Sequence, residues 1–220
     1  MLHCTFLDGG YHGEKLHDTE YQSCHESAFN AIRENASPEN SLPDNGCPKT
    51  TLPFQTLLLR MIEMIGQLLT EQGYHVCYTR CDDSMMTPSK VAELANTGLC
   101  QGKTEIPLQD SCLLSFHRSL LLCPGPSQTV EIFVYQRNSP SSRLAYSILD
   151  ELQKAGYRSL GVQERPNLTI LRRTNMPALF ITLGNLPLSF DNVDDNEQFL
   201  QETAEAFVRG VINHFSSSAT

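Results

Sequence analysis

Residues 177–184 read Pro-Ala-Leu-Phe-Ile-Thr-Leu-Gly, a short run that is almost continuously apolar. Residues 113–116, which read Leu-Leu-Ser-Phe, have the same character. A strand with one solvated face alternates apolar and polar residues, whereas a strand that is covered on both faces is apolar throughout. These two runs therefore predict buried strands in a sheet that has helices on both faces.

Short apolar runs and longer helical runs alternate along the rest of the chain. Including the two runs above, the short runs predict strands at residues 4–7, 75–79, 113–117, 130–135, 168–171 and 178–183. Apolar residues at three- and four-residue steps predict helices at residues 54–72, 141–154 and about 196–215, with a weaker helix at 89–96. Such alternation favours right-handed crossovers between parallel strands. We expect one α/β domain over residues 1–220, with a mostly parallel twisted central sheet flanked by helices on both faces.

One long segment interrupts this alternation. Residues 35–53 are rich in Ser, Pro, Asn and Gly and show no apolar period. Such a composition is typical of a loop, and a loop of this length is uncommon inside a compact domain. We therefore expect a surface insertion here.

The composition is that of a folded globular protein, with 40% hydrophobic and 19% charged residues. The formal net charge of −9 leaves no bulk basic surface for a phosphate backbone, so we expect no nucleic-acid partner. No run approaches the roughly 20 apolar residues of a membrane span, and the first residues do not resemble an export signal. The chain as written is expected in the cytoplasm, or in the cell envelope if it is a mature fragment or is released by lysis.

The eight cysteines are scattered, and several stand in apolar runs, as Cys77 and Cys112 do. No two of them have the Cys-x-x-Cys spacing of a redox or zinc motif. Cysteine in such surroundings behaves as a small hydrophobic residue. We expect buried free thiols and a reducing compartment.

Two histidines stand where strands are predicted to end. His12 lies in the glycine-rich turn after residues 4–7, and His117 closes the strand at 113–117. Ligands of open α/β sheets collect outside the carboxyl ends of strands, and two imidazoles with a carboxylate can hold zinc with one position open. The residues alone also allow a structural interpretation, with His12 in an exposed loop and His117 hydrogen-bonded in the core.

The order of several short motifs narrows these alternatives. In chain order they are residues 7–13 (Leu-Asp-Gly-Gly-Tyr-His-Gly), 73–80 (Gly-Tyr-His-Val-Cys-Tyr-Thr-Arg), 91–96 (Val-Ala-Glu-Leu-Ala-Asn), 115–117 (Ser-Phe-His), 142–145, 160–162 and 176–185. This succession resembles the zinc-dependent N-acetylmuramoyl-L-alanine amidases of the Amidase_3 class. The resemblance implies a peptidoglycan hydrolase that cleaves the lactyl amide between muramic acid and the stem peptide. It also implies one zinc ion held by two His and one Glu, and a further Glu on the last strand as the general base.

Carried onto this sequence, the resemblance makes His12 and His117 zinc ligands, although Tyr11 is an extra residue in the loop before His12. Glu26 is the candidate for the third ligand, because residues 26–30 match the Glu-x-x-x-Asn form of the family. Counting back from Gly73 instead places the third ligand near residues 54–55, where there is no carboxylate. His25 or another acid is a further alternative.

The last strand departs from the family. Thr182 stands where the resemblance places the catalytic Glu, and a hydroxyl is not a base near neutral pH. Glu131 is a substitute only if its side chain points to the same face, which alternation along its strand leaves undetermined. Two functions are therefore open: a zinc amidase with a relocated base, or a degenerate protein of the same fold that binds or regulates peptidoglycan without cleaving it.

Overall fold

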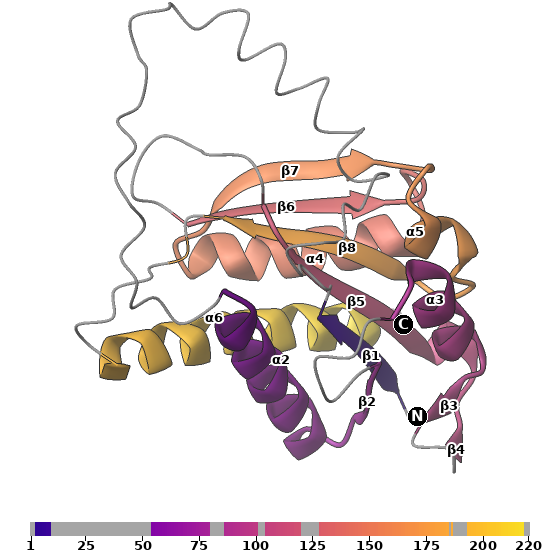
Figure 1. Ribbon diagram of the computed structural model, residues 1–220, viewed down its shortest axis with the longest axis horizontal. Coiled ribbons are helices and arrows are strands. Elements are labelled where there is room, and N and C mark those ends of the chain that lie inside the picture. Colours follow the sequence, from indigo (N-terminus) through magenta and orange to yellow (C-terminus); the bar gives the residue numbers. More distant parts are fainter. Residues whose placement is uncertain are drawn as a thin grey trace, which may run out of the picture.

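The computed structural model of the chain describes residues 3–9, 54–79, 86–100, 104–119, 128–184, 186 and 193–217. Within these ranges, six strands form one sheet in the order β2-β1-β5-β8-β6-β7 (Figure 1). Their bounds are β1 Cys4–Gly9, β2 His75–Tyr78, β5 Ser111–Arg118, β6 Thr129–Val134, β7 Arg158–Glu164 and β8 Ala178–Gly184. Neighbouring strands are parallel except for the antiparallel pair β6 and β8. The mostly parallel sheet is confirmed.

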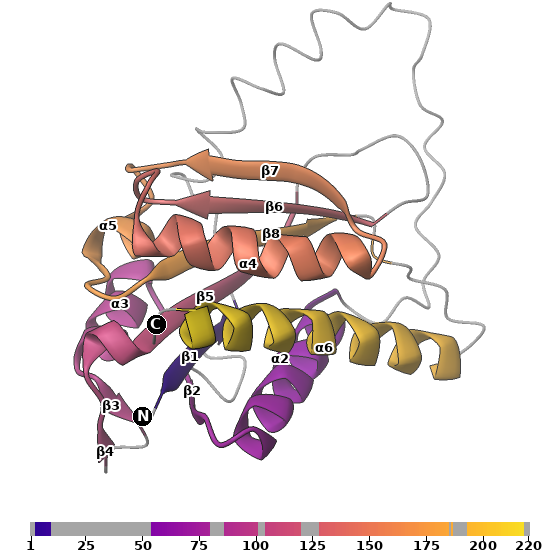
Figure 2. The same ribbon diagram turned by 180° about the vertical axis from the view of Figure 1, so that it is seen from behind.

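Helices cover both faces of this sheet, as predicted. Figure 1 is viewed from the side of α3 (Pro88–Asn96) and α5 (Thr169–Arg173). Figure 2, seen from behind, brings α4 (Pro140–Lys154) and α6 (Val193–Ser217) to the front, with α2 (Phe54–Glu71) beside them. A short antiparallel pair, β3 (Leu99–Cys100) and β4 (Thr104–Glu105), and the 3-10 turn η1 (Leu108–Asp110) lead into β5. No helix in the described ranges is both long enough and apolar enough to span a membrane.

Two hydrophobic cores fill the space between the sheet and its helices. The larger core joins the side chains of α2, α4 and α6 to one face of the sheet. Within it α4 and α6 approach so closely that a Cβ atom at Gly210 would lie 2.5 Å from the Cα atom of Ile148. The smaller core joins α3 and α5 to the opposite face. Because strand side chains alternate between faces, each central strand contributes to both cores.

The predicted helices at 54–72, 89–96, 141–154 and 196–215 are confirmed, with ends that differ by one to three residues. The first of them ends where Gly73 adopts a φ of +81°, a left-handed conformation that favours glycine. A capping box between Ser139 and Ser142, with Pro140 in the first turn, fixes the start of α4.

The predicted strand at 168–171 is wrong, and strand β7 was not predicted. Residues 169–173 form the short helix α5, in which Ile170 and Leu171 are buried against α3. A brief apolar run does not distinguish a buried strand from one turn of buried helix. Strand β7 lies at the edge of the sheet with only Val162 fully buried, so it carries little apolar signal. The predicted insertion at 35–53 lies outside the described residues.

Among the cysteines in the described ranges, Cys77 differs from the expectation. Cys4 and Cys112 are buried free thiols, as predicted. Cys77 is disulfide-bonded, so the prediction of a free thiol is wrong there. Disulfides depend on which cysteines meet in space, which the spacing along a chain does not give. The cysteines therefore no longer argue for a reducing compartment.

Candidate active site

Polar side chains replace apolar ones at one end of the sheet face that α3 and α5 cover. Phe6, Leu113 and Phe180 belong to the smaller core, on strands β1, β5 and β8. Two residues further along each strand stand Asp8, Ser115 and Thr182, which point to the same face because side chains alternate. These polar residues lie toward the carboxyl ends of three neighbouring parallel strands, the edge where open α/β sheets bind ligands.

A chain of hydrogen bonds joins Asp8 to His117 across strands β2, β1 and β5. The Thr79 hydroxyl donates to Asp8 Oδ1 at 2.6 Å, and the Ser115 hydroxyl donates to Asp8 Oδ2 at 2.6 Å. Ser115 Oγ also lies 2.7 Å from His117 Nε2. A hydroxyl has one proton, and a carboxylate only accepts, so the proton between Ser115 and His117 belongs to Nε2. The neutral imidazole then carries its lone pair on Nδ1.

The ring of His117 is stacked on one face and hydrogen-bonded at one edge. It stacks on Phe180 with ring centroids 3.6 Å apart and an angle of 10° between the planes. Only 9% of the residue is exposed. Imidazoles that ligate metals characteristically donate their other ring N–H to a carboxylate or to a group that leads to one. His117 is thus hydrogen-bonded in the core, as the structural interpretation of the sequence has it, and its role as a zinc ligand stays a prediction.

Thr182 and Glu131 continue the polar row across strands β8 and β6. Thr182 is paired in register with His117 on one side and with Glu131 on the other. Residues directly opposite one another in a sheet share a face, so the Glu131 side chain points to the same face as His117. This settles the direction that the sequence left undetermined. The Thr182 hydroxyl turns toward its neighbour strand and donates to the Glu131 carbonyl oxygen at 3.4 Å.

The Glu131 carboxyl group is buried, with 3% of the residue exposed. Its Oε1 accepts a short hydrogen bond from the Gln163 amide, whereas its Oε2 is buried and receives no hydrogen bond. Arg165 Nη2 donates to Gln163 Oε1 at 2.9 Å, which brings a positive charge near. Burial raises the pKa of the Glu131 carboxyl group, and the charge of Arg165 and the Gln163 hydrogen bond oppose that rise only in part.

The remaining predicted ligands, His12 and Glu26, lie outside the described residues. In the part of the chain that the structure describes, no three His, Cys, Asp or Glu side chains come together as a metal site requires. His12 and Glu26 therefore remain predictions. Asp8 and Ser115 belong to two of the sequence motifs, but no functional role was predicted for them. The Ser-x-His spacing could have indicated one for Ser115, because it places the hydroxyl and the imidazole on one face of a strand.

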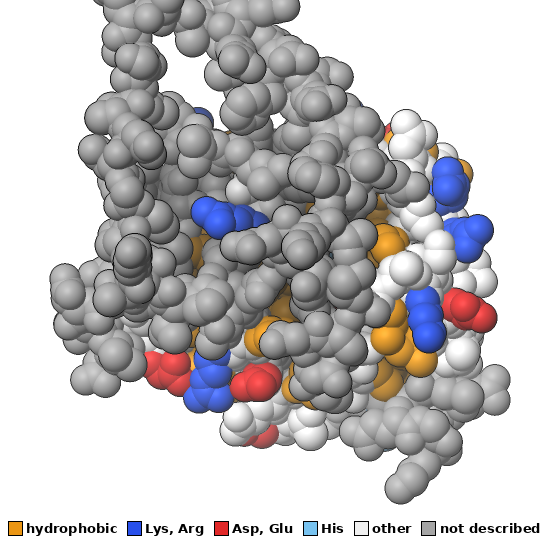
Figure 3. All heavy atoms as spheres, viewed as in Figure 1, with side chains coloured by type: hydrophobic (Ala, Val, Ile, Leu, Met, Phe, Trp, Pro, Cys, Tyr) orange, Lys and Arg blue, Asp and Glu red, His pale blue; other side chains and the backbone are white. Residues whose placement is uncertain are grey.

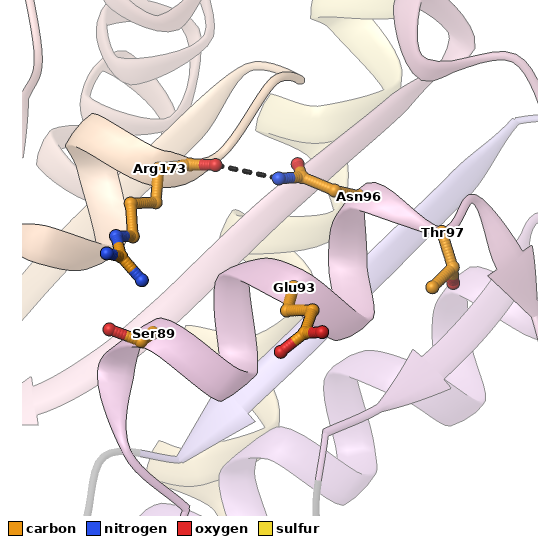
Figure 4. Close-up of a pocket in the computed structure, with 5 residues that line it drawn as sticks. All are labelled: Ser89, Glu93, Asn96, Thr97 and Arg173. Carbon is orange, nitrogen blue, oxygen red and sulfur yellow. Dashed lines mark hydrogen bonds between the residues drawn. The ribbon is translucent and has the colours of Figure 1, made fainter.

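An open pocket of about 540 Å³ lies between α3 and α5 (Figure 4), lined by Ser89, Glu93, Asn96, Thr97 and Arg173. Asn96, at the end of α3, is hydrogen-bonded there to the end of α5. It donates to the Arg173 carbonyl oxygen at 2.7 Å and accepts from the Asn175 backbone N–H at 2.7 Å. Asn175 precedes β8, so this end of the pocket lies where β8 begins, whereas the polar row lies where β8 ends. We assign the pocket to helix packing.

Basic side chains gather over α3 and α5 in Figure 3, although the chain as a whole is acidic. The exposed Arg172 and Arg173 of α5 contribute to this group. Because α5 ends just before β8 begins, these arginines lie at the opposite end of that sheet face from the polar row. An acidic ligand suits such a surface better than a basic one.

Comparison with known proteins agrees with this geometry. The family model described as N-acetylmuramoyl-L-alanine amidase matches residues 43–213. The chain belongs to this amidase family. The matched region includes His117, Glu131 and Thr182 and leaves out His12 and Glu26.

Relatives in sequence and in structure are distant. A probable cell wall amidase, LytH of Staphylococcus epidermidis, is 24% identical over 160 residues, covering 72% of this chain and 49% of the relative. The chain thus spans about half the length of that curated amidase. The N-acetylmuramoyl-L-alanine amidase from Clostridium difficile 630 superimposes with a TM-score of 0.65 at 19% identity over 98% of each chain. The catalytic domain of CwlV, from Bacillus (Paenibacillus) polymyxa, gives 0.63 at 16% identity over 98% of this chain and 99% of its own. The amidase fold covers almost the whole chain.

Proposed function

We propose that this member of the family is a zinc-dependent peptidoglycan amidase. Its substrate is the amide bond between the lactyl group of muramic acid and the L-alanine of the stem peptide. The hydrogen-bonded chain of Asp8, Ser115 and His117 carries this proposal, because it presents one oriented imidazole at the carboxyl edge of β5. Family membership supplies the substrate class.

The described residues fit one position of a zinc site. The His117 ring is stacked on Phe180, and its Nε2 lies within hydrogen-bond distance of the Ser115 hydroxyl. His12 and Glu26 are proposed to complete the set, since β1 is the immediate neighbour of β5 and leads toward His12. Zinc in such a set polarises an amide carbonyl and lowers the pKa of water.

The residues of the chain itself have two tasks in this reaction. Asp8 and Ser115 keep the Nε2 proton in place, so that His117 presents the same nitrogen throughout. Phe180 fixes the ring plane and excludes water from one side of it. We also propose that the chain meets this substrate in the cell envelope, where the disulfide of Cys77 is stable.

The test is zinc content together with muropeptide hydrolysis by the purified chain. Zinc per chain is measured by elemental analysis after dialysis against micromolar zinc and then against metal-free buffer. We expect one retained zinc and release of free L-alanine amines from muropeptides. His117→Ala is expected to lose both, whereas His75→Ala, a partly exposed histidine on β2 of the same sheet, keeps both. A chain that holds zinc but releases no amine contradicts the hydrolase proposal.

A second candidate function is supported by Thr182. Its hydroxyl cannot take a proton from water near neutral pH, and that hydroxyl already donates a hydrogen bond to the Glu131 carbonyl oxygen. The corresponding proposal is a non-catalytic protein that binds muropeptides through the same polar row. It predicts muropeptide binding by calorimetry that His117→Ala weakens, with no amine released over a long incubation.

A further inference from the structure

Hydrolysis of an amide at this site requires a base within reach of the attacking water. Strands of the six-stranded sheet present two carboxylates on the face of His117, within the described residues: Asp8 and Glu131. Asp8 accepts hydrogen bonds from two hydroxyls, one at each oxygen. Glu131 has one oxygen, Oε2, that receives no hydrogen bond. Of the two, Glu131 is the carboxylate with an oxygen that accepts no hydrogen bond from the described residues.

The strand register places this carboxylate across the polar row from His117. Thr182 is the one residue between them, in register with both. The two backbones are therefore about 10 Å apart, because neighbouring strands lie about 4.8 Å apart. His117 and Glu131 both have long side chains on the same face, while the side chain of Thr182 is short.

The local backbone leaves room beside Glu131. Opposite it, β7 carries a bulge, where the register steps from Val130 and Ser159 to Glu131 and Gly161. Gly161 has a φ of +97° and no side chain, and a Cβ built there would touch nothing within 4 Å. Bulges of this kind are frequent beside active sites, where they redirect a side chain. Gln163, on the same strand, then holds only Oε1 and leaves Oε2 unbonded.

We propose that Glu131 is the general base of this site, relocated to β6 from the neighbouring position on β8 that Thr182 occupies. The inference rests on the proposed amidase function and names the residue that the function lacks. Burial supports it, because a carboxyl group whose pKa is raised accepts a proton more readily at neutral pH than an ordinary one. Arg165 and Gln163 are the charged and polar groups that face it from the adjoining strand and the segment after it.

The proton transfer balances as follows. Water oxygen bonds to the lactyl carbonyl carbon while Glu131 Oε2 takes one of the water protons. The C–N bond to L-alanine then breaks, and Glu131 returns that proton to the departing nitrogen. The products are the lactyl carboxylic acid and a free amine on the stem peptide. No oxidant, reductant or further reactant is consumed.

Glu131→Gln tests this assignment, because it keeps the shape of the side chain and removes the base. In the zinc-loaded full chain we expect kcat for muropeptide hydrolysis to fall about 10²- to 10⁴-fold. We expect zinc content and the muropeptide Kd from calorimetry to stay at wild-type values. The melting temperature is expected to stay at the wild-type value or to rise. The matched control is Glu164→Gln, an exposed glutamate on β7, which is expected to leave all four quantities unchanged. The double variant Glu131→Gln/Thr182→Glu returns a carboxylate to β8 and is expected to regain part of the rate.

Each outcome separates the two proposals. Hydrolysis by wild type together with an unchanged rate in Glu131→Gln overturns the assignment of Glu131 and leaves the amidase function standing. A rate that falls in parallel with zinc content or muropeptide affinity also overturns it, because Glu131 would then be structural. A wild-type chain that binds zinc and muropeptides without hydrolysis overturns the amidase function and the base with it. Loss of the acidic limb of the kcat/KM profile in Glu131→Gln supports the assignment.

Discussion

The two faces of the sheet are built from the same strands and have different contents. Under α2, α4 and α6 the central strands present an almost wholly apolar face, in which Thr5 of β1 is a buried polar residue that lies against Cys112. Under α3 and α5 it is apolar only where those two helices cover it, and it turns polar toward the carboxyl ends of β1, β5 and β8. On β5, Leu114 and Phe116 point into the first face, while Ser115 and His117 point into the second.

This difference assigns separate tasks to residues that are neighbours in the sequence. Burial of apolar area on the first face stabilises the fold, and a polar group buried there needs a hydrogen-bond partner. The shorter helices of the second face leave the strand ends for groups that make hydrogen bonds and exchange protons. A sheet with one face of each kind can hold a buried Asp, Ser and His in place without weakening its main core.

The largest effect is expected from truncating a side chain of the first face. Phe116 is fully buried and meets Phe207 of α6 edge to face, with ring centroids 5.1 Å apart. Phe116→Ala is expected to lower the free energy of unfolding by about 3–5 kcal/mol, measured by urea denaturation. Tyr146→Ala, at an exposed position on α4, is the control and is expected to change it by less than about 0.5 kcal/mol. Equal losses in the two variants would contradict the division of tasks.

The second largest effect is expected at Ser115, which precedes Phe116 on β5 and points to the other face of the sheet. Ser115→Ala breaks the link between Asp8 and His117 and removes the partner of the Nε2 proton. We expect zinc affinity to fall about 10- to 100-fold, as is typical when the hydrogen-bond partner of a metal ligand is removed. Competition with a fluorescent chelator measures this. A variant that binds zinc as tightly as wild type would show that Ser115 does not orient His117.

Patterns within single segments predicted most of the fold. The apolar runs at 113–116 and 178–181 are strands buried on both faces, and the helical period of residues 54–72 gives α2 almost to the residue. Apolar residues mark buried positions, so both kinds of buried element are recognised from them. Strand β7 was not predicted because it is an edge strand with few buried residues. The short helix α5 was predicted as a strand because its buried apolar residues form a run as brief as that of a buried strand.

Patterns within single segments could not predict the hydrogen bonds that connect the residues of the site. Asp8 lies 71 residues from Thr79 and 107 residues from Ser115, and they meet only because β1 lies between β2 and β5. The direction of Glu131 likewise follows from an antiparallel register with Thr182 on β8. Strand order and register are properties of the assembled sheet. The sequence therefore indicates which residue types are present at the strand ends, and the fold decides which of them meet.

The third effect is a difference between two buried carboxyl groups in how they make stability depend on pH. Glu131 on the second face has a raised pKa, chiefly because of burial, whereas hydrogen bonds from Lys154 and Arg209 lower the pKa of Glu151 between α4 and α6. A raised pKa favours folding at low pH, and that stability is lost as pH rises above the ordinary glutamate value of about 4.3. A lowered pKa does the reverse, so its stability is present above that value and is lost on acidification.

The two glutamine variants therefore diverge with pH. Relative to wild type, the free energy of unfolding of Glu131→Gln is expected to rise as pH increases above about 4.3, while that of Glu151→Gln is expected to fall as pH increases toward about 4.3 and to stay lower above it. Urea denaturation at intervals on both sides of that value measures both. Parallel curves for the two variants would show that the carboxyl groups do not differ in the way that their surroundings indicate.

The smallest effect is a difference in the rate at which the two faces open. Cys4 lies in the smaller core and Cys112 in the larger core, both are fully buried, and burial raises the pKa of both thiols to about 12. The thiolate is the form that reacts with iodoacetamide, so labelling of the native protein at pH 8 proceeds only when a core opens. Helices α3 and α5 are short, and α2, α4 and α6 are longer. We expect mass spectrometry to show Cys4 modified before Cys112, and both at once in urea. If Cys112 reacts first, the larger core is the looser one, and the second face owes its order to the Asp8 hydrogen bonds more than to the helices over it.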